Sequence, residues 1–289
     1  MKQGKHILKT AYVAVTFVAV AMSFVAATYA WFSSNSVVQT DYVTGRADTD
    51  TVELQVSSSG GGSFAAQEQA AISQVNETSV EQLLPVSTAD LENFVFCAGT
   101  VEDAAVNFVK VENEKYYYHG RIYLRAVAEG HSENAKLRLY LDNADESGGA
   151  LFQNMQGYMA NAARLGLAFD GGNRHILRVS EYSNPEANRT FNTVLNGSTL
   201  GDGQVIDSSG SSLDAVDDPS EALAVYTIGA EGVTDNSVKP LVTMNLNQIY
   251  EVDIYFYMEG CDPDCSDVAQ LDALDFHLSF YGILTEEAE

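Results

Sequence analysis

Four segments of this sequence alternate apolar and polar residues, and this alternation constrains the fold more than any other feature. Ile122, Leu124 and Ala126 share one side of the segment 116–129, and the residues between them are mostly charged or aromatic. The same alternation occurs in the segments 136–141, 252–258 and 274–281. A period of two places successive side chains on opposite faces of a strand. We therefore predict antiparallel sheets that each bury one face.

Shorter apolar segments are further strand candidates, and from all the candidates together we expect about nine or ten strands. These segments are 51–56, 92–97, 106–111, 165–170, 175–179, 222–228 and 241–246. Gly171-Gly172-Asn173 separates two of them and predicts a hairpin turn. Met155, Met159 and Ala163 recur every four residues, which predicts a helix near 152–164. The pattern predicts an all-β, mainly antiparallel fold: a jelly-roll-like β-sandwich with one or two short helices.

The sequence predicts three regions and shows no internal repeat. Residues 1–32 form a signal peptide or a hydrophobic anchor helix. Residues 33–63 comprise an exposed extended segment, a first strand and a Gly/Ser linker. A single jelly-roll domain follows at 64–289. Within this domain, the segment 197–220 is rich in Gly, Ser and Asp, which predicts a long polar loop.

The N-terminus has the features of an exported protein. Three lysines occur in the first ten residues, and the segment 11–32 carries no charge. A basic start, an apolar run and small residues at Thr28 and Ala30 are typical of a secretory signal cleaved between Ala30 and Trp31. Every acidic residue follows this run, so we expect the rest of the chain outside the cytoplasm, extracellular or at the cell surface.

Two alternatives to this cleavage remain open. As a helix, the uncharged run of 22 residues would be about 33 Å long, which is enough to cross a bilayer and keep the protein as a membrane anchor. Gly4-Lys5 before the apolar run also resembles a pilin-type leader, although Lys9 stands where a glutamate is usual. In each case the chain meets the membrane only through its N-terminal segment.

The excess of negative charge excludes two classes of partner. The chain has 40 acidic and 15 basic residues and a formal net charge of −25. Nucleic acid binding needs a basic surface that contacts phosphates, and binding to anionic lipid headgroups needs a basic cluster as well. We therefore expect no nucleic acid partner, and no lipid-headgroup partner beyond the N-terminus.

Three segments together resemble one family of exported proteins from Gram-positive bacteria. The first is the lysine-rich start and apolar run that ends in Ala-Thr-Tyr-Ala-Trp-Phe. The second is 83–88 (LLPVST), and the third is 253–267 (DIYFYMEGCDPDCSD), where Glu-Gly-x-Asp-x-x-Cys follows a strand. As a set they resemble the TasA/camelysin-like family. This resemblance implies a jelly-roll surface protein released by a dedicated signal peptidase, and the best-known members are biofilm-matrix fibre subunits.

The sequence has no catalytic or cofactor-binding motif, so we expect no enzyme activity. Some members of the family have been labelled metallopeptidases, which need a ligand pair such as His-Glu-x-x-His on a helix. His119 and His277 fall on the polar faces of predicted strands and are expected to be solvated. The other histidines are His6, His131 and His175, and none has the required spacing. A Gly-x-Ser-x-Gly elbow, a phosphate loop and a dinucleotide fingerprint are also missing.

Two cysteines flank the tripeptide Asp-Pro-Asp directly after a predicted strand. These are Cys261 and Cys265, and outside the cytoplasm we expect a disulfide between them, with two free thiols as the alternative. The third cysteine, Cys97, lies in an apolar run and is expected in the core.

Acidic residues near these cysteines form a weak candidate site for calcium, the only cofactor the sequence suggests. Asp262, Asp264 and Asp267 offer carboxylate oxygens in a loop, as Ca²⁺ prefers, although solvated surface acids are the simpler interpretation. The acidic clusters within 142–146 and 214–218 have the same two interpretations.

The favoured function is a filament or biofilm-matrix subunit that self-associates. In this hypothesis the segment 33–45, freed by signal cleavage, adds as a strand to the sheet edge of the next subunit. Main-chain hydrogen bonds would supply most of the affinity. The candidate anchors of this donor strand are Val37, Val38, Tyr42 and Val43.

The alternative is a membrane-anchored adhesin or glycan-binding β-sandwich module. Its basis is a set of tyrosines on the polar faces of predicted strands, where aromatic rows bind sugar rings or proteins. They are Tyr123, Tyr140, Tyr255, Tyr257 and Tyr281. The other interpretation of these tyrosines is that a second sheet or an inserted loop covers them.

Overall fold

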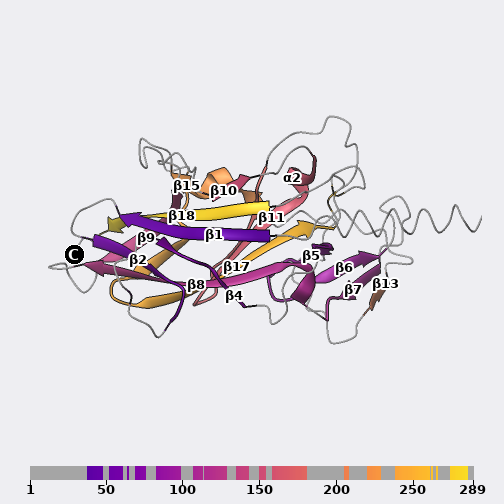
Figure 1. Cartoon of the computed structure of the whole chain (residues 1–289), viewed down its shortest axis with the longest axis horizontal. Coiled ribbons are helices and arrows are strands. Elements are labelled where there is room, and N and C mark those ends of the chain that lie inside the picture. The colour runs from indigo at the N-terminus through magenta and orange to yellow at the C-terminus, as the bar shows by residue number, and fades with distance from the viewer. Residues whose placement is uncertain are drawn as a thin grey trace, which may run out of the picture.

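In the computed structural model, the protein is all-β, with two sheets that enclose a shared core (Figure 1). The structure describes residues 38–47, 52–60, 64, 69–75, 83–98, 107–112, 114–128, 135–142, 150–153, 158–180, 205–207, 220–228, 238–260, 262, 265 and 274–285. The predicted signal segment and its cleavage position, Ala30–Trp31, lie outside these residues. Within the described ranges, no helix has both the length and the apolar composition that crossing a bilayer requires.

The smaller sheet, sheet A, joins the first described strand to the last. Its strands are β1 (Val38–Ala47), β3 (Gln69–Ala70), β9 (Lys136–Asp142), β10 (Ala150–Gln153), β15 (Thr227–Ile228), β16 (Val242–Asn245) and β18 (Leu274–Thr285). The strand order is β15-β9-β18-β1-β3, with β10 also paired to β18 and β16 to β9. Most pairs are antiparallel, but β1 runs parallel to β18 and β15 runs parallel to β9.

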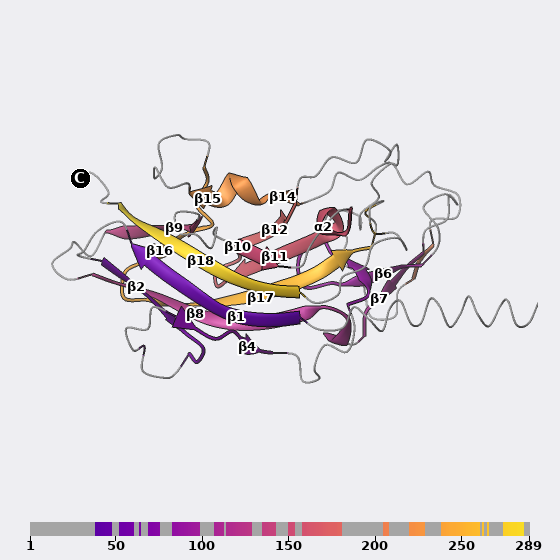
Figure 2. The same cartoon turned by 45° about the horizontal axis from the view of Figure 1, so that its top comes forward.

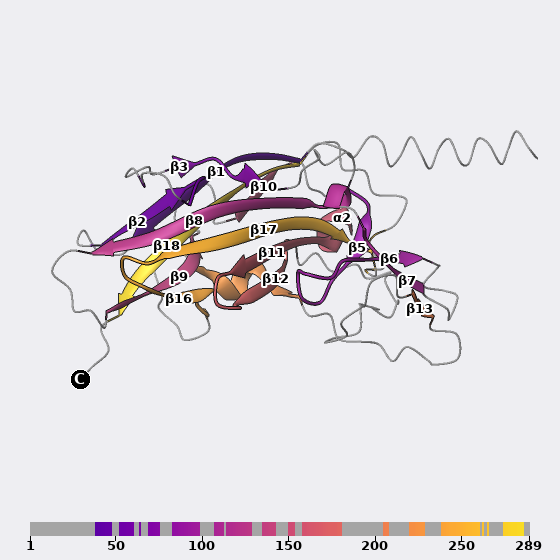
Figure 3. The same cartoon turned by 90° about the horizontal axis from the view of Figure 1, so that it is seen from below.

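The larger sheet, sheet B, is built around β8 and β17. Its strands are β2 (Val52–Ser57), β4 (Ser73–Gln74), β5 (Pro85–Ser87), β6 (Val95–Ala98), β7 (Asn107–Lys110), β8 (Tyr118–Ala128), β11 (Ala163–Phe169), β12 (Arg174–Arg178), β13 (Val205–Asp207), β14 (Glu221–Ala222) and β17 (Ile249–Glu259). The main order is β13-β7-β6-β5-β17-β11-β12-β14, and β8 pairs with β17 on one side and with β2 and β4 on the other. Figure 3 shows β8, β17, β11 and β12 as neighbours in one layer.

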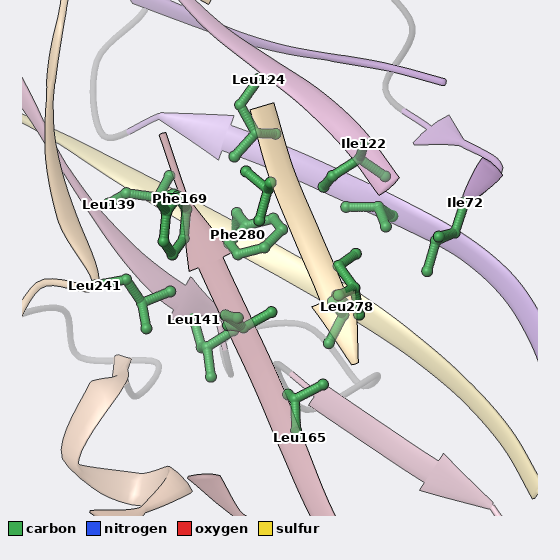
Figure 4. Packing of buried hydrophobic residues seen from close by; sticks show 14 of the residues in the cluster. Ile72, Ile122, Leu124, Leu139, Leu141, Leu165, Phe169, Leu241, Leu278 and Phe280 are labelled. Atoms are coloured by element: carbon green, nitrogen blue, oxygen red, sulfur yellow. The ribbon is translucent and has the colours of Figure 1, made fainter. Parts of the chain in front are cut away.

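The core between the sheets comes from the alternation seen in the sequence. Ile122 and Leu124 of β8 and Leu278 and Phe280 of β18 are all 0% exposed, and they belong to one continuous cluster. Figure 4 shows these side chains pointing toward one another between the strands. Since burying a Leu or Phe side chain contributes roughly 1.5–3 kcal/mol, this cluster is the main source of the fold's stability.

A second cluster of apolar residues covers the outer face of sheet B. We call it the outer cluster; it consists of Val86, Leu91, Phe94, Tyr117, Ile176, Tyr255 and Tyr257. The rings of Phe94 and Tyr117 stack with centroids 3.9 Å apart, and the Phe94 ring meets Tyr257 edge-on at 5.4 Å. Because of this cover, β17 is buried on both faces from Ile254 to Glu259.

The predicted outer-face tyrosines had two interpretations, an exposed binding row or residues covered by another part of the chain, and the outer cluster decides between them. Tyr255 and Tyr257 are buried under the segment that carries Phe94, and Tyr140 is 3% exposed. Tyr123 and Tyr281 are half-buried. The tyrosines of β17 therefore pack against an inserted segment and do not form an exposed row for sugars.

Leu91 fixes this covering segment onto the sheet. Its backbone has a φ of +60°, a conformation that side chains other than glycine rarely adopt. The Leu91 N–H donates to Thr88 Oγ1 at 3.1 Å, which holds the turn. The Leu91 side chain lies over Gly166 of β11, where a Cβ atom would stand 2.6 Å from Leu91 Cδ2. A larger residue at 166 would therefore force the Leu91 side chain to shift.

Some expected elements are confirmed and others are wrong. The hairpin of β11 and β12 is confirmed, with Gly171 and Gly172 at φ values of +91° and +94°. The helix predicted over 152–164 shrinks to α2 (Tyr158–Ala162), because β11 begins at Ala163 and pairs with β17. In place of its first turn, β10 ends at Gln153.

Two other expectations need correction for local reasons. The strand predicted at 222–228 is mostly the 3₁₀ helix η2 (Leu223–Tyr226), where Thr227 Oγ1 donates to the Leu223 carbonyl. Within the predicted loop 197–220, β13 pairs with β7 and extends sheet B. A further 3₁₀ turn, η1 (Glu114–Tyr116), precedes β8.

Candidate functional site

The candidate site for assembly is the position that β1 occupies in sheet A. Figures 1 and 2 show β1 running alongside β18 for most of its length. The parallel register pairs Val43 with Leu278, Thr44 with Ser279 and Gly45 with Phe280. On its other side, β1 pairs with the two residues of β3, at Val43 and Thr44. The N-terminal segment is therefore a paired strand in its own sheet, whereas the sequence predicted an exposed extended segment.

Alternate residues of β1 face opposite sides of sheet A. Val43 is 0% exposed and belongs to the main core. Thr44 faces the other side, where its Oγ1 donates to Ser279 Oγ at 2.9 Å. At Gly45 a Cβ atom would point back toward the core, 3.0 Å from Leu54 Cδ2 and 3.2 Å from Val56 Cγ2 of β2. We call the space that β1 fills between β18, β3 and β2 the β1 slot.

Of the four predicted donor-strand anchors, the structure describes one side chain in full. Val43 lies in the core, as an anchor should. Val38 pairs with Leu274 at the start of β1, and Tyr42 lies in a bulge between the paired residues Thr40 and Val43. Val37 lies outside the described residues.

The turn after β17 brings together two segments that are far apart in the sequence. β5 pairs in parallel with the end of β17 at Met258 and Glu259, and the Gly260 N–H donates to the Val86 carbonyl at 2.9 Å. These residues belong to 83–88 and 253–267, two of the three segments that carry the family resemblance. A Cβ atom at Gly260 would lie 3.0 Å from the Pro85 carbonyl carbon, so the two segments are in close contact.

A buried ion pair fixes this turn. Arg164 of β11 is 1% exposed, and its Nη2 donates to Asp262 Oδ2 at 2.9 Å. Arg164 Nη1 also donates to the carbonyl oxygens of Asn161 and Ala163. The guanidinium therefore joins α2, β11 and the turn after β17. The sequence pattern did not single out Arg164, which falls at the end of a predicted helix.

The pairing with Arg164 changes the interpretation of the predicted calcium site. Asp262 directs one carboxylate oxygen to the guanidinium, while Asp264 and Asp267 lie outside the described residues. Among the residues that the structure describes, no group of three His, Cys, Asp or Glu side chains could hold a metal ion. Cys261 also lies outside the described ranges, so its disulfide with Cys265 stays a prediction.

The expectation that His119 and His277 are solvated is wrong, since they are 7% and 6% exposed. His119 lies on the outer face of β8, which the segment before β8 covers. Its ring stacks on Tyr255 with centroids 4.3 Å apart. Its Nε2 is 3.2 Å from Asp253 Oδ1, and its Nδ1 is 3.5 Å from Glu114 Oε2.

Asp253 is the centre of a cross-strand charge network on β8 and β17. Arg121, its register partner, binds it through Nε at 2.7 Å and Nη2 at 3.1 Å. Arg121 Nη1 also reaches Glu251 at 2.8 Å. Burial opposes ionisation of Asp253, but hydrogen bonds from His119 and Arg121 outweigh it, so the pKa of Asp253 lies below its ordinary value. The network links β8 to β17 through charged side chains as well as through the backbone pairing of the two strands.

We predict that the stability of the folded protein depends on pH through His175 of β12. Its Nε2 donates to the Leu241 carbonyl at 2.6 Å, and its ring meets Tyr226 edge-on at 4.7 Å. Burial lowers the pKa of His175 below its ordinary value of 6.5, although the Leu241 carbonyl and Glu221 act in the opposite direction. Below pH 6.5 the unfolded chain takes up the proton more readily than the folded one, so stability falls.

The measurement is the thermal midpoint of the wild-type protein and of His175→Gln between pH 7.5 and 5. We expect the midpoint of the wild type to fall more steeply toward low pH than that of the glutamine variant, which keeps a donor for Leu241. Parallel curves for the two proteins would contradict this role of His175.

Comparison with known proteins adds no relative from which a function could be carried over. No protein-family model, curated protein or solved structure matches this chain.

Proposed function

We propose that this protein is an exported structural subunit that self-associates into filaments of an extracellular or biofilm matrix. In this proposal β1 of one chain fills the β1 slot of the next chain. The observation that carries the proposal is the place of β1: a strand close to the predicted cleavage position, inserted beside β18 with Val43 in the core. An identical strand from a second copy would make the same contacts, as in other domain-swapped assemblies.

The division of β1 and β2 between the two sheets supports such an exchange. β1 pairs with β18 in sheet A, whereas β2 pairs with β8 in sheet B. Because the two strands have separate partners, β1 can pair with a neighbouring chain while β2 keeps its place on β8. Main-chain hydrogen bonds to β18 and burial of Val43 would then supply the affinity.

The remaining parts of the proposal come from the sequence. The N-terminal segment directs export, and its cleavage after Ala30 frees the donor strand from the membrane. We also propose a jelly-roll type for the sandwich, because the connections β1–β2, β8–β9 and β17–β18 each pass from one sheet to the other. The buried tyrosines of β17 no longer favour the glycan-binding alternative.

Electron microscopy of the secreted protein tests the proposal. We expect filaments from the mature chain and none from a chain that lacks residues 31–45, because this deletion removes most of β1. Circular dichroism shows whether the shortened chain keeps its sheets, and intact-mass measurement shows whether the native N-terminus has been cleaved. Filaments formed by the shortened chain would contradict strand exchange.

A further inference from the structure

The β1 slot leaves little room at Gly45. The atoms nearest to a Cβ there, Leu54 Cγ and Cδ2 at 3.0 Å and Val56 Cγ2 at 3.2 Å, belong to side chains that are 4% and 1% exposed. Contacts this short force a neighbour to move, and these neighbours are themselves packed in the core. A residue larger than glycine at this point of the slot therefore requires the side chain of Leu54 or Val56 to give way by a few tenths of an ångström.

The neighbours of Gly45 make this narrow point sensitive to register. The core-facing positions of β1 carry Val43, Gly45 and Ala47, and Gly45 pairs with Phe280. A shift of the strand by two residues brings Val43 or Ala47 to the narrow point. A shift by one residue turns the Thr44 side chain into the core and breaks its hydrogen bond to Ser279. The observed register is the one that places glycine beside Leu54 and keeps the hydrogen bond between Thr44 and Ser279.

We propose that Gly45 is a specificity determinant that restricts the β1 slot to a strand with glycine in register with Phe280. The partner that this filter admits is a second copy of this chain, through its own residues 43–47. We call this selection for glycine at position 45 the steric filter. That it selects between strands of different chains rests on the proposed strand exchange. Within one chain, the steric filter acts on the chain's own β1.

The first experiment measures the filter in the full mature chain by thermal unfolding. Because overpacking a filled core is destabilising, we expect Gly45→Val to lower the midpoint by about 4–8 °C. Leu54→Ala removes the two nearest of these atoms, Cγ and Cδ2 of Leu54. In the Leu54→Ala background, the same glycine substitution should therefore lower the midpoint by less than half as much. Thr44→Val, which faces away from the core, is the matched control and should show no such dependence on Leu54.

The second experiment asks whether the filter acts between chains. Fluorescent Gly45→Val chains are mixed with wild-type chains or with Leu54→Ala chains, and incorporation into filaments is counted by microscopy. We expect several-fold higher incorporation with Leu54→Ala, because the enlarged slot accepts the valine strand.

The two experiments separate the inference from the proposed function. An equal loss of midpoint for Gly45→Val in both backgrounds would overturn the filter. A smaller loss of midpoint in the Leu54→Ala background, without higher incorporation of Gly45→Val chains into Leu54→Ala filaments, would support the steric filter and overturn strand exchange. A smaller loss of midpoint together with higher incorporation would support both the steric filter and strand exchange.

Discussion

Replacing Arg164 with methionine is expected to lower the free energy of unfolding by about 3–5 kcal/mol. The substitution keeps an apolar stem but leaves the Asp262 carboxylate, whose side chain is 10% exposed, without the guanidinium it binds. Removing the ion-pair partner of a buried charge is among the most costly single changes to a fold. Because domains are stable by only about 5–15 kcal/mol, this one residue carries a large share of the total. Urea denaturation of the wild-type and variant proteins measures the change.

A double-mutant cycle isolates the ion pair. Asp262→Asn alone leaves the guanidinium partly unsatisfied, and we expect it to destabilise the protein as well. The double variant, Arg164→Met with Asp262→Asn, should be less destabilised than the sum of the two single variants, because both charges are gone. Strict additivity would show that the pair does not hold the turn after β17.

Val43→Asp is expected to lower the free energy of unfolding by more than about 4 kcal/mol and to abolish filaments. Val43 is 0% exposed in the main core, where a carboxylate has no partner in the surrounding apolar cluster. The same side chain would have to enter the slot of a neighbouring chain. Denaturation and electron microscopy of the same preparation measure both effects.

The control for this substitution is the adjacent residue. Thr44→Asp places the same charge on the opposite face of β1 and removes one hydrogen bond to Ser279, so its expected cost is only about 1 kcal/mol. Filament formation should persist in this variant. An equal loss of unfolding free energy in Val43→Asp and Thr44→Asp would show that a charge has the same effect on both faces of β1.

The central strands could be predicted from the sequence because their signal is local. Residues 122, 124 and 126 of β8 and 276, 278 and 280 of β18 alternate without interruption, and each set lies in the core. β1 could not be predicted as a paired strand, because a bulge between Thr40 and Val43 breaks its period of two. The strand therefore resembled an irregular extended segment.

The buried polar residues could not be predicted, because their partners are distant in the sequence. His119 occupies a polar position on β8, but Glu114 and the outer cluster cover it. Arg164 binds Asp262, almost a hundred residues later. A charged residue next to Ala163 and Leu165 was the one available signal, since a buried arginine requires a carboxylate partner.

The proximity of 83–88 and 253–267 also emerged only from the fold. The sequence presented them as separate segments of one resemblance, and the structure pairs β5 with the end of β17. Gly260 and Pro85 are in van der Waals contact there, which explains why a residue without a side chain follows Glu259. The predicted disulfide, when formed, would close the turn at this same place.

Cross-linking between singly substituted chains tests strand exchange most directly. Thr44→Cys and Ser279→Cys replace hydroxyls that are 2.9 Å apart on neighbouring strands, a separation that suits a disulfide. The two variants are mixed, allowed to assemble and oxidised, and the cross-linked peptides are identified by mass spectrometry. The account predicts a disulfide between residue 44 of one chain and residue 279 of another. A bond that forms only in a chain carrying both substitutions, and only within that chain, would contradict it.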